Sequence, residues 1–364
     1  MKVKEIIAVL EEFAPPQLQE DYDNTGLNIG NHDSTITGIL LCIDVTPDVI
    51  NEAIENKCNL IIAHHPLIFG KIKKITGANY VEKSIITAIK NDISIYAGHT
   101  SFDSVSNCVS YKICEKLGLE NLQILSAKKS YLKKLAVFVP STHELQVRTA
   151  LFEAGAGKIG NYDSCSFNTQ GKGSFRGNEG TNPFVGNQGV MHIEDEVKIE
   201  CVFPKHLQHK ILKAVLNAHP YEEVAYDIYS LDNDWNMAGL GMIGLPKTSI
   251  SEKELLKSLK SIFDLTNIRH SNLLNKKIKR IAVCGGSGAS FIPDAIRSGA
   301  DVYITGDIKY HEYFMAENKI LLIDIGHFES EQFTKEIFYD IIMKKNPNFA
   351  VRFSQIITNP IKNY

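Results

Sequence analysis

Short segments that are apolar at every position constrain the fold of this chain most strongly. Residues 39–43, 60–63 and 95–97 are of this kind, and segments with apolar residues at helical spacing separate them. A strand that alternates apolar and polar residues can face water on one side, whereas a continuously apolar strand must be covered on both faces. The pattern therefore predicts an α/β fold in which helices cover a mixed or parallel sheet.

The C-terminal part of the chain repeats this pattern, and the middle does not. Predicted strands at 279–283, 300–305 and 319–324, each with a run of apolar residues, lead into glycine-containing turns. The middle reads strand, helix, glycine-rich stretch, strand, helix, strand, which predicts a small βαββαβ ferredoxin-like unit with a long hairpin. We expect residues 1–128 and 233–364 to form the two halves of a split α/β core, with residues 129–232 as an inserted α+β domain.

Composition and charge narrow the classes of protein to which the chain can belong. The net charge of −3 argues against a general nucleic-acid binder, which would carry a basic excess. The apolar residues near the N-terminus fall at helical spacing, which predicts an amphipathic helix and not a signal peptide. We find no apolar stretch long enough to cross a bilayer. The seven cysteines include no Cys-x-x-Cys pair, which fits reduced thiols in the cytoplasm.

Residues that can bind metal ions follow several of the apolar segments. In open α/β sheets, ligands bind at the carboxyl ends of the strands. His64 and His65 are adjacent, so in an extended segment their rings point to opposite sides and suit two neighbouring ions better than one. His327 and Glu331 are four residues apart at the start of a helix and share a face. Asp103 can supply a carboxylate that bridges two ions. The sequence therefore predicts a site for two divalent metal ions.

The predicted ligand set also suggests which metal binds and what it does. Three imidazoles and two carboxylates are few ligands for two ions, which leaves positions for water or substrate. Zinc fits this set best, with iron or manganese as alternatives, and calcium does not fit it. Two ions that share a water lower the pKa of that water and generate a nucleophile near neutral pH.

Each of these residues also has an ordinary structural interpretation. A single histidine after a strand can be a satisfied structural residue, Asp103 can cap the following helix, and Glu331 can be a surface acid. Four further residues could carry protons, orient a ligand or bind substrate, or serve only as helix caps or strand ends: His99, His311, Asp44 and Asp307. We assign His99 and His311 as candidate proton carriers.

Two further motifs could be chemical or structural. Gly285-Gly286-Ser287-Gly288 lies between a strand and a helix, where backbone N–H groups can hold an anion, although a tight turn explains it equally well. His219-Pro220-Tyr221-Glu222-Glu223 ends a predicted helix before a strand. We interpret it as a helix stop with a buried tyrosine and not as a second metal site.

Several motifs together resemble one protein family. Residues 61–69, 98–103 and 326–331 resemble the motifs of the dinuclear-metal-centre hexameric family. That family is also described as GTP cyclohydrolase I type 2 homologs and as relatives of the yeast NGG-interacting factor. The resemblance extends from residues 23–27 to the final helix. Residues 160–167 and 219–223 resemble the insert of the longer bacterial members, a domain similar to the nitrogen-regulatory signal proteins.

The resemblance carries its own expectations about site, assembly and activity. The five proposed ligands match the metal-ligand pattern of the family position by position. The family forms toroidal homohexamers whose metal sites face an internal cavity. The cyclohydrolase description implies attack of metal-activated water on the purine C8 of GTP.

We thus expect a metal-dependent hydrolase that acts on a nucleotide or another phosphorylated small molecule. The alternative is a non-catalytic regulatory or metal-handling hexamer, which the signal-protein-like insert favours. A DNA-associated role rests on a family name alone, and the acidic charge balance speaks against it.

Overall fold

The computed structural model describes residues 1–362 and divides into two compact units. The larger unit combines Met1–Ser126 with the chain from Ala238 onward, and the smaller unit spans Ala127–Met237. We expected the insertion at residues 129–232. Each unit has its own hydrophobic clusters, and each is described separately below.

The first sheet of the larger unit has five strands in the order β1-β4-β3-β2-β17. Its central strands β2 (Ile39–Cys42), β3 (Leu60–Ala63) and β4 (Ser94–Ala97) are parallel and buried at every position. The edge strand β1 (Gly26–Ile29) is antiparallel to β4, and β17 (Val351–Phe353) is parallel to β2. The prediction of a mixed sheet is confirmed.

Helices cover both faces of this sheet, and the residues of β3 show why its sequence is continuously apolar. Leu60 and Ile62 belong to a cluster with α1 (Val3–Phe13) and α11 (Thr334–Lys345). Ile61 and Ala63 point to the other face and join a cluster with α2 (Pro47–Glu55) and α3 (Tyr80–Lys90). Because successive side chains of a strand alternate between faces, a strand between two helical layers needs apolar residues throughout.

The second sheet of the larger unit has six strands in the order β12-β16-β15-β14-β10-β5. The strands β14 (Ile281–Ser287), β15 (Val302–Gly306) and β16 (Leu321–Asp324) are parallel, and β10 (Trp235–Pro246) is antiparallel to β14. One face packs against α5 (Val109–Lys116) and α8 (Glu252–Phe263), and the other against α9 (Ile292–Arg297). The other elements are β5 (Leu119–Lys128), which is an edge strand of this sheet, β11 (Ile250–Ser251), β12 (Arg269–His270), β13 (Lys277–Ile278), α4 (His99–Ser104) and α10 (His327–Glu331).

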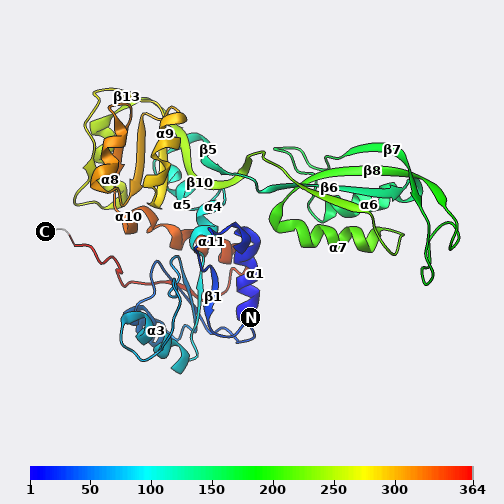
Figure 1. Cartoon of the computed structure of the whole chain (residues 1–364). Helices are drawn as coiled ribbons and strands as arrows, with labels where there is room; N and C mark the ends of the chain where they lie inside the picture. Colours follow the sequence, from blue (N-terminus) through cyan, green and yellow to red (C-terminus); the bar gives the residue numbers. More distant parts are fainter. Residues whose placement is uncertain (363–364) are drawn as a thin grey trace. The chain divides into compact units, whose positions relative to one another are not determined.

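Helices of the larger unit lie between its two sheets. In Figure 1, α10 and α11 run between the sheet that carries α8 and α9 and the sheet that carries α3. The contacts agree, because α10 packs on β14 and α11 packs on β2. The carboxyl ends of strands from both sheets therefore lead toward the same interior region.

The smaller unit is ferredoxin-like, as the sequence predicts. Its elements are β6 (Leu132–Pro140), α6 (Glu144–Glu153), β7 (Phe167–Phe175), β8 (His192–Pro204), α7 (Gln208–Ala218) and β9 (Tyr226–Ser230). The strands form an antiparallel sheet in the order β7-β8-β6-β9, and β7 and β8 make the long hairpin (Figure 1).

Strands β6 and β8 are longer than the segments 135–139 and 197–203 that their apolar residues mark. The ends of both strands carry charged residues. The apolar pattern therefore detects only the part of each strand that packs against the helices.

Two properties of the whole chain accompany this fold. None of the helices within residues 1–362 is both long and apolar enough to cross a membrane. All seven cysteines, which lie within the described residues, are free thiols, and only Cys165 is not buried. Six of them therefore pack as small apolar side chains.

A substitution at Gly98 tests the close packing that leads into the candidate site. A methyl group there would lie 2.7 Å from a ring carbon of Phe102 and 2.9 Å from Cζ of Phe338, and both rings are buried. We expect Gly98→Ala to lower the free energy of unfolding by about 1–3 kcal/mol, measured by urea denaturation. Gly70→Ala is the matched control, because its methyl group would meet open space. Equal stability of the two variants would contradict this packing.

Candidate metal centre

The five predicted ligands follow strands of both sheets in the larger unit. His64 and His65 come directly after β3, and Asp103 lies on α4, which begins two residues after β4. His327 and Glu331 lie at the two ends of α10, which follows β16. Residues that are more than 260 positions apart in the sequence thereby reach one place, since His65 and His327 are in direct contact.

The carboxylate of Glu331 lies at the centre of this group. Its Oε1 atom is 3.4 Å from Nε2 of His64, and its Oε2 atom is 3.0 Å from Nε2 of His65 and 3.1 Å from Nε2 of His327. The Nε2 atoms of His65 and His327 are 3.2 Å apart. Oδ1 of Asp103 is 3.8 Å from Nε2 of His64. The carboxylate that contacts all three histidines is therefore that of Glu331, and Asp103 lies beside His64.

The group is buried and polar, and several of its atoms lack hydrogen bonds. His64 is 0% exposed and Glu331 is 3% exposed. Both ring nitrogens of His64, Oδ1 of Asp103 and Oε2 of Glu331 have no hydrogen-bond partner among the described residues. Because buried polar atoms nearly always have partners, such a concentration requires an explanation. Imidazole nitrogens and carboxylate oxygens converging on one point fit a divalent cation such as zinc.

Two carboxylates orient the histidines from behind. Nδ1 of His65 is 2.8 Å from Oδ1 of Asp44, and Nδ1 of His327 is 2.7 Å from Oδ2 of Asp307. In each pair, Nδ1–H donating to the carboxylate leaves Nε2 directed toward Glu331. Histidines that bind metals usually donate their other ring N–H to a carboxylate or carbonyl in this way. Asp44 and Asp307 thus orient His65 and His327, which is one of the roles that the sequence left open.

The same contacts shift the protonation of the group. Burial opposes the charged form of His65, but the adjacent carboxylates of Asp44 and Glu331 outweigh it and raise the pKa to about 10. Burial likewise opposes the charge on His327, and the adjacent carboxylates of Asp307 and Glu331 raise the pKa to about 11. Burial and the neighbouring Glu331 charge raise the pKa of Asp103 to about 8. The metal-free centre therefore holds protons at neutral pH that a metal ion would displace.

His99 lies beside the group, and His311 does not. The His99 ring centroid is 5.4 Å from that of His65 and 5.7 Å from that of His64. Its Nδ1 is 2.6 Å from Oδ1 of Asp23, a loop residue that also accepts from the backbone N–H of Thr100. His311 is exposed on a 3-10 segment (Tyr310–Ala316), and its recorded ring contacts are with Tyr310 and Phe314. Of the two predicted proton carriers, His99 is the one whose ring contacts the group among the described residues.

The glycine turn at residues 285–288 leaves space for the side chain of Glu331. Three of its backbone N–H groups already have hydrogen-bond acceptors within the protein, so they do not bind an anion. The N–H groups of Gly285, Gly286 and Gly288 donate to the hydroxyls of Ser110, Ser330 and Thr305. Gly286 has a φ of +66°, and a side chain there would clash with Oε1 of Glu331. Of the two interpretations of this motif, the tight turn is the one that the structure supports.

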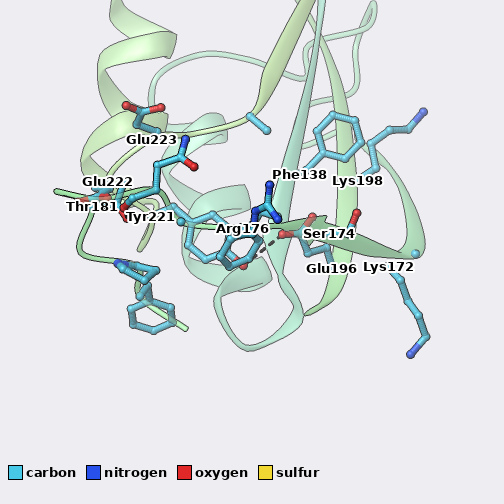
Figure 2. Close-up of a pocket in the computed structure, with 18 of the residues that line it drawn as sticks. Phe138, Lys172, Ser174, Arg176, Thr181, Glu196, Lys198, Tyr221, Glu222 and Glu223 are labelled. Atoms are coloured by element: carbon cyan, nitrogen blue, oxygen red, sulfur yellow. Dashed lines mark hydrogen bonds between the residues drawn. The ribbon is translucent and has the colours of Figure 1, made fainter. Parts of the chain in front are cut away.

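A cleft of about 660 Å³ lies within the smaller unit. Figure 2 shows Arg176, Glu196 and Tyr221 together in it, with the phenol of Tyr221 donating to Glu196. Our expectation of a buried tyrosine was wrong, because Tyr221 is only half-buried at the wall of this cleft. Sequence patterns gave no sign of the cleft, since its walls come from the exposed face of the sheet and from loops.

His219, near this cleft, is a structural residue. Its Nε2 donates to the carbonyl of Phe138 at 2.9 Å, and its Nδ1 accepts from the N–H of Tyr221 at 3.1 Å. Because both ring nitrogens are used, the residue has no atom left for a metal ion.

The whole chain is similar in sequence and structure to proteins of one family. The family model for Duf34/NIF3 (NGG1p interacting factor 3) matches residues 1–360. A "GTP cyclohydrolase 1 type 2 homolog" from Halalkalibacterium halodurans is 39% identical over 360 residues, which cover 98% of this chain and 97% of that protein. A Bacillus subtilis protein of the same name is 39% identical over 338 residues, covering 92% and 90%. The crystal structure of a Bacillus cereus protein related to NIF3 covers 100% of this chain and 99% of its own, with 38% identity and a TM-score of 0.85.

The pH dependence of stability tests the pairing of His327 with Asp307. A raised folded-state pKa stabilises the fold fully below the ordinary value of 6.5, and that contribution is lost as the pH rises toward about 11. We expect the metal-free chain to be more stable than its Asp307→Asn variant at about pH 6, and this advantage to shrink by about pH 9. Urea denaturation at both pH values measures it. An advantage that stays constant with pH would contradict the pairing.

Proposed function

The chain belongs to the Duf34/NIF3 family, and from that premise we propose that it binds two divalent metal ions on His64, His65, Asp103, His327 and Glu331 and is a metal-dependent hydrolase. The observation that carries the proposal is the contact of one buried carboxylate, that of Glu331, with three imidazoles. We propose zinc as the metal, with iron or manganese as alternatives.

The two oxygens of Glu331 support a pair of ions more than a single one. Oε1 faces His64, which also contacts Asp103, whereas Oε2 faces His65 and His327. One carboxylate can therefore serve both halves of the centre. His64, His65 and Glu331 alone already place three donor atoms within 4.8 Å of one another.

The chain's own residues support hydrolysis in the following way. When bound, the two ions would lower the pKa of a shared water and so supply a nucleophile near neutral pH. Asp44 and Asp307 keep the histidine Nε2 atoms directed inward. Asp23 holds His99 beside the centre, where its Nε2 can accept or return a proton.

We propose a nucleotide or another phosphorylated small molecule as substrate. The name of the curated relatives makes GTP the first compound to test. The amides of Gly285, Gly286 and Gly288 are occupied by hydroxyl groups, so phosphate recognition does not come from those amides. We also propose that the chain works in the cytoplasm as a homohexamer.

A non-catalytic regulatory or metal-handling protein is the second candidate function. The observation that favours it is the cleft of the smaller unit, which is a potential effector site in addition to the metal centre. Metal binding is common to both candidates, and turnover separates them.

Elemental analysis of the purified protein tests the metal assignment. We expect two ions per wild-type chain and a loss of most of this metal in the His64→Ala, Glu331→Ala double variant, because each change removes a central donor. The double variant His209→Ala, Glu179→Ala is the matched control, since both of these residues are exposed on the smaller unit. Circular dichroism confirms folding. Retention of two ions by the first variant would refute the assignment.

Turnover by the metal-loaded protein tests hydrolysis. GTP and a panel of other nucleotides are incubated with the wild type and with His99→Gln. We expect product from the wild type and a kcat lower by about 10²–10⁴-fold in the variant, because a positioned proton carrier contributes that much. Full metal occupancy without turnover on any compound would favour the regulatory function instead.

A further inference from the structure

The segment after β17 is tied to the first sheet at its beginning. The backbone N–H of Ser354 donates to the carbonyl of Leu41 at 2.8 Å. The next residue, Gln355, donates its N–H to Oε1 of Glu52 on α2 at 2.8 Å. These bonds continue the pairing of β17 with β2 and set the direction in which the chain leaves the sheet.

The segment then becomes exposed before it makes contact again. Ile357 is 73% exposed. The following two residues are half-buried, and both use their side chains as donors. Oγ1 of Thr358 donates to Oδ2 of Asp44 at 2.6 Å, and Nδ2 of Asn359 donates to Oε1 of Glu329 at 2.8 Å.

The two acceptors belong to opposite halves of the candidate metal centre. Asp44 follows β2 and uses its other oxygen, Oδ1, to accept from His65. Glu329 lies on α10 between His327 and Glu331 and packs against Gly326, where a side chain would clash with it. Two adjacent residues that follow the exposed Ile357 therefore contact both the carboxylate behind His65 and the helix that carries His327 and Glu331.

We propose that residues 354–359 form a strap and that Thr358 and Asn359 are positioning residues of the metal centre. The inference rests on the proposed metal binding and deepens it. Thr358 fixes the second oxygen of the Asp44 carboxylate, so that the first stays in line with Nδ1 of His65. Asn359 fixes the position of α10 relative to the Asp44 carboxylate through its hydrogen bond to Glu329. The strap thereby links the carboxylate that orients His65 to the helix that carries His327 and Glu331.

Hydrogen bonds behind a ligand affect binding because they determine where the ligand points before the ion arrives. Loss of a residue that directly orients a metal ligand costs about 10–100-fold in affinity. Thr358 is one hydrogen bond further from the ion than Asp44, so its loss should cost less, about 3–10-fold.

Cobalt(II) titration of the full chain tests the strap. Visible absorption of the bound cobalt reports both affinity and coordination, and a competing chelator calibrates the scale. We expect Thr358→Val to weaken binding about 3–10-fold and to change the cobalt spectrum, because His65 is less well oriented. Thr358→Ser keeps the hydroxyl and should restore both. Asn359→Ala should weaken binding in the same direction.

Thr37→Val is the matched control. It is the same substitution and also removes a hydroxyl that donates a hydrogen bond, in this case to the carbonyl of Lys57 at 2.7 Å. Thr37 lies just before the start of β2, whereas Asp44 follows the end of that strand. We expect unchanged cobalt affinity and spectrum in this variant. Thermal unfolding of the metal-free variants checks that each is folded.

The outcomes separate the strap from the proposed function. A wild type that binds cobalt while Thr358→Val binds it with equal affinity and an identical spectrum would overturn the strap alone. A wild type that binds no cobalt would overturn the metal centre and the strap with it. An equal loss in Thr37→Val would also overturn the strap, because the effect would then not be specific to the contact with Asp44.

Discussion

The buried carboxylate of Glu331 is the group on which the arrangement of the larger unit depends. Moving a carboxylate out of water costs several kcal/mol, and the fold must offset this cost with partners placed around it. Three imidazoles contact its two oxygens, and their attraction holds its pKa well below the usual range despite burial. The turn at Gly286 carries no side chain because one would collide with this carboxylate. The backbone at Gly286 thus leaves space for a charged side chain that a purely apolar core would not accommodate.

Both sheets contribute to this group because each directs the carboxyl ends of parallel strands toward the same interior region. A strand end delivers a side chain with little freedom, since the preceding residues are fixed in the sheet. His65 and His327 come from different sheets, and each has a carboxylate behind it, Asp44 and Asp307 respectively. The two halves of the centre are therefore built alike, and they meet at Glu331. This explains how an insertion such as Ala127–Met237 can interrupt the chain without separating the histidines from Glu331.

Much of this could be predicted from the sequence, for reasons that the structure makes clear. Continuously apolar strands such as β3 are visible because both faces are buried, and His64 and His65 are visible because polar residues directly after such a strand are unusual. Asp23 could not be assigned a role, because a loop acid 76 residues from His99 carries no periodic signal. The position of His311 could not be predicted either, since no sequence pattern shows in which direction the side chains of the 3-10 segment Tyr310–Ala316 point. The half-buried Tyr221 was taken as buried because sequence patterns do not show which face of a sheet lacks helices.

The most direct test of the account is anomalous X-ray scattering from crystals of the protein purified without chelators. Data collected on both sides of the absorption edge of each candidate metal identify the element and locate it in the same experiment. The account predicts two anomalous peaks, both within coordination distance of Glu331, one beside His64 and the other beside His65 and His327. Crystals with full occupancy of these side chains and no anomalous peak beside Glu331 would contradict it.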